Sequence, residues 1–163
     1  MDTVTIVIGV AMTAIVIISL VLLGRRGKRT NYRLFELLTI AANRENCQIS
    51  EYEVFGDFVV GMDKQKNYVF FIKILGESDE THSINLAEIK SCKNNIVSRT
   101  VSFSGGNNNV IDSLSLNLIP KDNSPAVELE FYNAEKSTQL NGEFQLIEKW
   151  QKIINEQIQG KNK

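Results

Sequence analysis

The chain has 163 residues, with 18 Lys and Arg against 19 Asp and Glu and a hydrophobic content of 43%. This length corresponds to one domain of ordinary size. The near-neutral balance excludes a strongly basic nucleic-acid-binding protein, and two cysteines are too few for a disulfide framework.

The charge is unevenly distributed along the chain. Residues 25–33 contain no acid and five basic residues, namely Arg25, Arg26, Lys28, Arg29 and Arg33. From Leu34 to Lys163 there are 13 Lys and Arg against 18 Asp and Glu, a balance of −5. We therefore expect no nucleic-acid partner, because nucleic acid requires a basic face.

Residues 1–24 are predicted to be a transmembrane helix. No charged residue occurs from Thr3 to Leu23, and this run makes about 32 Å of helix, enough for a hydrocarbon core about 30 Å thick. The alternative is a cleaved signal peptide. The N-terminus lacks a basic residue and the apolar run is too long for that, so we expect a retained anchor.

The basic collar after the run predicts the orientation. Lys and Arg beside a span mark its cytoplasmic side. We therefore expect a single-pass, integral membrane protein with its N-terminus outside and its C-terminal domain in the cytoplasm. Thr5, Gly9 and Thr13 share one face of the span and would allow self-association, although such residues are also simply tolerated in membrane helices.

Residues 25–48 combine the collar with a linker helix. Leu34, Leu37, Leu38 and Ala41 recur at helical spacing. The helix is expected either to pack on the following domain or to lie along the membrane surface.

Residues 49–159 are predicted to form a mostly β domain, followed by a tail at 160–163. Apolar residues alternate in about seven short runs, most clearly at Leu114, Leu116 and Leu118. Such antiparallel strands form a barrel or two crossed sheets. An amphipathic C-terminal helix is expected to cap the open end, with the apolar stripe Leu146, Ile147, Trp150, Ile153, Ile154 and Ile158. The predicted fold class is thus a transmembrane helix plus an α+β domain.

The order of seven strands and a terminal helix over residues 50–158 resembles the pleckstrin-homology-like (PH-like) fold. It is similar to small bacterial membrane proteins that carry such a domain behind an anchor. Trp150, in Glu148-Lys149-Trp150, lies where the capping helix of that fold often places an aromatic plug, so we expect it in the core. The resemblance implies a peptide added as a strand in a groove between Ile96–Phe103 and Glu143–Ile158.

Lipid recognition is a second implication of the resemblance. Family members that bind phosphoinositides carry basic residues around the first hairpin, because several phosphates need several cations. The candidates for lipid contact are Lys64, Lys66 and Lys73. Asp63 lies beside them and no arginine is present, which departs from the family pattern and favours a solvated turn.

No arrangement of residues predicts catalysis, a cofactor or a metal. His82 is the only histidine and has no evident nucleophile partner. Glu128 and Glu130 share one strand face, which is typical of a solvent-facing strand. Ser104-Gly105-Gly106 lacks the Lys-Ser/Thr of a phosphate loop. Cys47 and Cys92 are interpreted as buried thiols.

The leading functional hypothesis is a membrane-anchored, non-enzymatic interaction or scaffold module with a protein or peptide partner. The alternatives are a domain that senses anionic lipid at the membrane surface and, less favoured, an enzyme of unknown chemistry.

Overall fold

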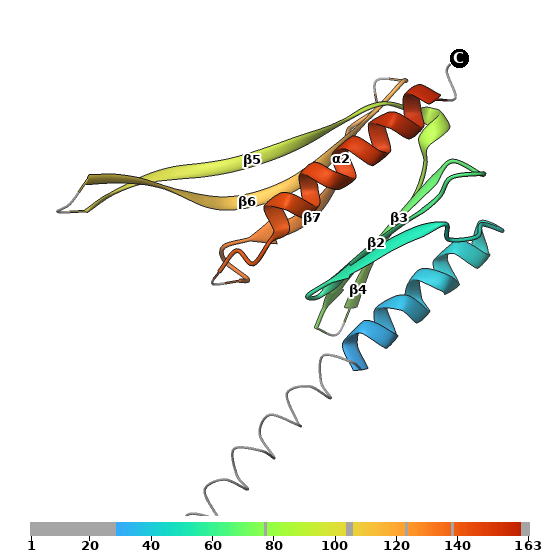
Figure 1. Ribbon diagram of the computed structural model, residues 1–163, viewed down its shortest axis with the longest axis horizontal. Helices are drawn as coiled ribbons and strands as arrows, with labels where there is room; N and C mark the ends of the chain where they lie inside the picture. Colours follow the sequence, from blue (N-terminus) through green and yellow to red (C-terminus); the bar gives the residue numbers. More distant parts are fainter. Residues whose placement is uncertain (1–28, 77, 104–105, 123, 138, 161–163) are drawn as a thin grey trace, which may run out of the picture.

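The computed structural model describes residues 29–160, apart from residues 77, 104–105, 123 and 138. Within these ranges the chain forms two antiparallel sheets and two α-helices (Figure 1). One helix covers residues 29–44, and α2 is Glu143–Gly160. The short 3-10 helix η1, Leu86–Glu88, joins the two sheets.

Each sheet keeps its strands in sequence order. The first sheet is β1-β2-β3-β4, with bounds Glu51–Phe55, Phe58–Asp63, Tyr68–Leu75 and Ser78–Asn85. The second sheet is β5-β6-β7, with bounds Ile89–Phe103, Gly106–Pro120 and Val127–Asn133. β5 and β6 have 15 residues each, so β7 is far shorter than the strand it pairs with.

The main core lies between the two sheets and α2. Phe58 and Phe71 of the first sheet meet Phe131 of β7, with ring centroids 5.0 Å and 5.5 Å from that residue. The second sheet supplies Leu114, Leu116 and Leu118, and α2 supplies Leu146, Ile147, Trp150, Ile154 and Ile158. Trp150 is 0% exposed, which confirms its predicted place in the core.

The outer face of the first sheet is buried as well, beneath the helix of residues 29–44. Leu34 and Leu38 pack on Val59, Phe70 and Ile72. Because both faces of the sheet are covered, β2 and β3 are continuous apolar runs instead of alternating ones.

The close approach of this helix requires a small residue beneath it. Gly61 lies under Leu38, and a Cβ built on Gly61 would come within 3.0 Å of Leu38 Cδ2. An ion pair of 3.0 Å between Arg33 and Asp79 of β4 adds a polar contact at the other end of the helix.

The predicted fold class is wrong. It joined a transmembrane helix to a capped barrel or crossed sheets, whereas the structure is a small α+β domain with a four-stranded sheet, a three-stranded sheet and two helices. In the described ranges, neither helix is long and apolar enough to cross a membrane. α2 carries Glu148, Lys149 and Lys152, and a charged side chain costs about 2.5–3.5 kcal/mol at the centre of a bilayer.

The same finding corrects the predicted location. No helix that the structure describes supports an integral, single-pass protein with an outer N-terminus and a cytoplasmic domain. The residues on which that interpretation depended lie outside the described ranges: Thr3, Thr5, Gly9, Thr13, Leu23, Arg25, Arg26 and Lys28. Of the two placements open for the linker helix, the structure has it packed on the domain, because Leu34 and Leu38 are fully buried there.

Leu38→Ala should destabilise the protein, because it opens a cavity between the helix of residues 29–44 and the first sheet. The expected loss is about 2–5 kcal/mol of unfolding free energy. Urea unfolding of the full chain, followed by circular dichroism, measures it. The exposed Glu36→Ala on the same helix is the control. Equal stability of the two variants would show that the helix is not held by this contact.

Trp150→Ala should destabilise the protein by about 3–5 kcal/mol, since the indole fills the space between α2 and both sheets. Lys152→Ala changes an exposed residue of the same helix and should alter the stability by less than about 0.5 kcal/mol. An unchanged melting temperature for Trp150→Ala would contradict the role of α2 in closing the core.

Candidate interaction site

The predicted groove between β5 and α2 is closed at its inner end. The Asn155 side chain of α2 accepts a hydrogen bond from Cys92 N at 3.0 Å and donates one to Cys92 O at 2.8 Å. Two residues further along β5, Asn94 Oδ1 lies 3.4 Å from Gln151 Nε2. A side-chain amide therefore makes the two bonds that a paired strand would make at Cys92.

From Ile96 to Thr100 the outer edge of β5 is open in the described part of the chain. In an antiparallel ladder, residues that bond to the neighbouring strand alternate with residues whose N–H and C=O point away from it. Cys92 points away from β6, as its bonds to Asn155 show. The same alternation directs the backbone of Ile96, Ser98 and Thr100 outward, and in the described part of the chain no strand pairs with this edge.

The open edge belongs to a two-stranded ribbon, residues 96–103 and 106–112, that projects beyond the rest of the domain (Figure 1). β7 pairs with β6 only from Ser113 to Leu118. The ribbon exposes Ile96, Val97 and Val110, at 41%, 46% and 37%. A two-stranded ribbon alone is of marginal stability in water, so this element gains most from an added strand.

The two edges of the ribbon differ. The register of β5 with β6 shifts between Val97 and Ser98, where Asp112 is the extra residue on β6. The Asp112 carboxylate forms an ion pair with Arg99, with 3.1 Å between Oδ1 and Nε. The backbone carbonyl of Asp112 accepts a hydrogen bond from Ala134 N. This bulge and its contacts interrupt the β6 edge and leave the β5 edge straight.

The three lysines predicted for lipid contact do not converge. Lys64 pairs with Glu51 at 2.7 Å, and Lys66 Nζ donates to the carbonyl of Asn46. Both lie in the turn between β2 and β3, whereas Lys73 pairs with Phe58 at the other end of that hairpin. Lipid contact by these residues stays a prediction without a shared site.

Lys73 is instead part of a polar contact that joins the two sheets. Its side chain is 4% exposed, and Nζ lies 3.0 Å from Glu130 Oε1 and 3.1 Å from Glu130 O on β7. Lys136 and Asn133 also donate to the Glu130 carboxylate. Burial by itself raises the pKa of Glu130, but the bonds from Lys136, Asn133 and Lys73 outweigh it and lower the pKa to about 2.

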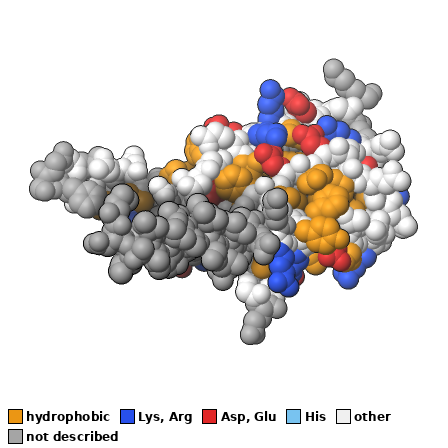
Figure 2. All heavy atoms as spheres, turned by 60° about the horizontal axis from the view of Figure 1, so that its bottom comes forward, with side chains coloured by type: hydrophobic (Ala, Val, Ile, Leu, Met, Phe, Trp, Pro, Cys, Tyr) orange, Lys and Arg blue, Asp and Glu red, His pale blue; other side chains and the backbone are white. Residues whose placement is uncertain are grey.

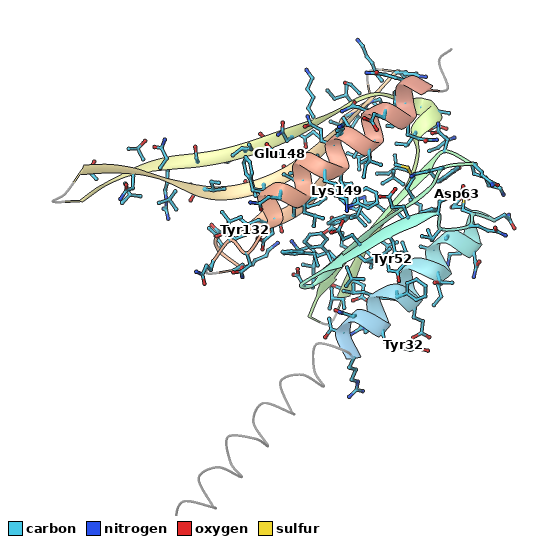
Figure 3. The ribbon with its side chains drawn as sticks, viewed as in Figure 1. Tyr32, Tyr52, Asp63, Tyr132, Glu148 and Lys149 are labelled. Carbon is cyan, nitrogen blue, oxygen red and sulfur yellow. The ribbon has the colours of Figure 1, made fainter. Side chains whose placement is uncertain are left out.

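The buried Asp63 organises the turn that carries Lys64 and Lys66. Its carboxylate accepts bonds from the backbone N–H of Gln48, Gln65 and Lys66 at 2.7–2.9 Å. Burial alone raises the pKa of Asp63, and these bonds reverse the effect and lower it. The acid that seemed to argue against lipid binding at this turn therefore has a structural role; Figure 3 shows it at the end of β2.

The remaining candidate residues make short polar contacts, and Glu80, Ser115 and Glu128 line one cavity together with Glu130 and Lys136. Arg29 is exposed. His82 Nε2 lies 2.7 Å from Glu80 Oε1, and Glu128 accepts a 2.5 Å bond from Ser115. Among the residues that the structure describes, no three His, Cys, Asp or Glu side chains lie close enough together to hold a metal ion.

Both cysteines are buried, as the sequence predicted. Burial raises the pKa of the Cys92 thiol to about 12. Burial, followed by the neighbouring Asp63 carboxylate, raises the pKa of Cys47. Both thiols are therefore protonated and unreactive at neutral pH.

Two further surface features were not found from the sequence. Phe35 and Tyr52 form an exposed aromatic pair with ring centroids 4.9 Å apart. Figure 2 shows a face of the molecule on which hydrophobic side chains gather. A cleft of about 550 Å³ lies between η1 and the segment from β6 to β7, with Ile84, Ile89 and Val127 in its walls. Its described lining contains no histidine or cysteine.

The open β5 edge was predicted only in part. The alternation in Ile96–Phe103 indicated a strand there. It did not indicate that the polar contacts of α2 with β5 extend only as far as Asn94. A detectable signal was the pair of long alternating runs on both sides of Gly105-Gly106, which indicates a hairpin longer than any neighbouring strand.

Comparison with known proteins finds no matching family model, no matching curated protein and no matching solved structure. The PH-like resemblance therefore stays a prediction that depends on the order of the elements.

Glu130→Gln should lower the free energy of unfolding at neutral pH. It should also make that free energy fall less steeply as the pH is lowered below about 4.5. The folded pKa of Glu130, about 2, lies below its ordinary value of 4.5. The stabilising contribution is thus complete above about pH 4.5 and is lost as the pH falls toward 2. Urea unfolding between pH 2 and 7 measures this. Glu135→Gln, at an exposed neighbouring residue, is the control, and a wild-type acid profile for Glu130→Gln would contradict the assignment.

Proposed function

We propose that this protein is a non-enzymatic interaction module that takes an extended segment of a protein partner as an added strand on the open edge of β5. The observation that carries the proposal is the outward-facing, unpaired backbone of Ile96, Ser98 and Thr100 on the described edge. Strand addition supplies affinity through main-chain hydrogen bonds and needs no catalytic group.

The surroundings of the edge support this mode of binding. At Cys92 the side-chain amide of Asn155 bonds to both the backbone N–H and the backbone C=O. The backbone amide of an added strand would make the same two kinds of hydrogen bond further along the edge. Ile96 and Val97 lie on opposite faces of the ribbon and are exposed, so an added strand would cover apolar surface on both. The PH-like resemblance implies the same mode, with the peptide on this strand.

The contacts described above favour this proposal over the other two hypotheses. Lys64, Lys66 and Lys73 each have a partner within the protein, and Lys73 lies away from the other two. A nucleophile needs a base within hydrogen-bond reach. In the described residues the Ser115 hydroxyl donates to Glu128 and the His82 ring bonds to Glu80, so the only histidine is not bonded to this hydroxyl.

Peptides that bind the full chain can be selected from a displayed random library. Binding of such a peptide should slow amide hydrogen exchange at Ile96, Ser98 and Thr100. Ser98→Pro should weaken their binding about tenfold or more, because proline removes an outward N–H and its ring obstructs the added strand. The bonds to β6 use other residues and stay in place.

Ser98→Thr keeps the N–H and the hydroxyl and is the matched control. Peptides that bind Ser98→Pro as tightly as the wild type, or that protect residues away from β5, would show that the edge is not the binding site.

A further inference from the structure

The β5 edge lacks the usual protection against pairing with a like edge. Natural edge strands are blunted by lysine, proline, bulges or a covering element. Residues 95–112 contain no lysine and no proline, and their only charges are Arg99 and Asp112, which pair with each other. The bulge lies on β6, and α2 bonds to β5 only at Cys92 and Asn94.

The open edge is also self-complementary. The outward-facing residues Ile96, Ser98 and Thr100 are symmetric about Ser98. In an antiparallel pair centred there, Ser98 faces its own counterpart and Ile96 faces Thr100 of the second copy, so the outward N–H of each of these three residues meets a C=O. Centring the pair on Arg99 would bring two arginines together, and like charges directly opposite are destabilising.

The charge of the domain favours contact through the ribbon. Residues 34–163 carry a balance of −5, so two domains repel each other when their bodies meet. The ribbon projects from the body (Figure 1). In the pair centred on Ser98, Ile96 of one copy faces Thr100 of the other, so the two points where the ribbons leave their bodies are separated along the strands by a length of about 13 Å at roughly 3.3 Å per residue. That length exceeds the screening distance of about 8 Å at physiological salt.

We propose that the occupant of the β5 edge is a second copy of this chain, paired antiparallel about a two-fold axis at Ser98. The inference rests on the proposed function and names its partner. The two ribbons then form one four-stranded sheet in the order β6-β5-β5-β6, and the interface is the same surface on both copies. The outward N–H and C=O groups of Ile96, Ser98 and Thr100 are then paired, so this edge needs no lysine or proline to prevent aggregation.

Cysteine cross-linking of the full chain tests the register. Residues directly opposite in a hydrogen-bonded antiparallel pair have Cα atoms about 5.5 Å apart, which is within the range for a disulfide. Ser98→Cys should therefore form a covalent dimer on mild oxidation. Thr100→Cys faces Ile96 of the second copy and should not cross-link. Cys47 and Cys92 are buried and do not compete.

Sedimentation over a range of concentrations tests the association itself. The wild type and Ser98→Thr should dimerise with rising concentration, and Ser98→Pro should need about ten times more protein. Circular dichroism confirms that Ser98→Pro is folded, and the cross-linking result does not depend on that variant.

Three outcomes would overturn the inference: a wild type that is monomeric throughout, equal cross-linking at positions 98 and 100, or a dimer that Ser98→Pro does not weaken. The proposed function fails separately. If the wild type is monomeric but selected peptides protect Ile96–Thr100, the edge binds another protein and only the second copy is excluded. If neither happens, both proposals are wrong.

Discussion

The packing of α2 across the corner between the two sheets is the contact on which the rest of the structure depends. Its apolar stripe, with Trp150 at the centre, belongs to one buried cluster with residues of both sheets, so the helix completes the core that the sheets begin through Phe58, Phe71 and Phe131. Its polar contacts depend on the same placement: Asn155 bonds to Cys92, and Lys149 Nζ pairs with Glu53 of β1 at 2.6 Å (Figure 3). Where α2 stops covering β5, the open edge begins.

The two sheets differ in how completely the rest of the domain covers them. The first sheet is covered on one face by the main core and on the other by the helix of residues 29–44. The second sheet extends past its cover, because β7 pairs with only part of β6. The ribbon therefore carries outward main-chain groups, those of Ile96, Ser98 and Thr100, that pair with no described strand. Such groups are the contacts that strand addition uses.

The polar contact of Lys73 with Glu130 shows how burial changes the meaning of a charged residue. On the strand pattern alone, Glu130 belongs to a solvent-facing row and Lys73 to a basic hairpin. In the fold, β3 and β7 bring the two side chains together across the gap between the sheets, and Lys136 and Asn133 complete the cluster. Removing Glu130 would leave the buried Lys73 ammonium without its compensating charge, whereas Glu130 would keep Lys136 if Lys73 were removed.

Local patterns in the sequence determined much of the secondary structure. The alternation at Leu114, Leu116 and Leu118 and the stripe through Trp150 depend only on the periods of strand and helix, and these residues are buried as that periodicity requires. The tertiary structure decided the rest, because no local pattern specifies which surface covers which. The helix of residues 29–44 packs on the first sheet at Gly61, and Lys73 pairs with Glu130. Asn155 and Gln151 cover β5 as far as Asn94. The open edge depends on where α2 lies against β5, a distance between segments about 60 residues apart that only the packed fold sets.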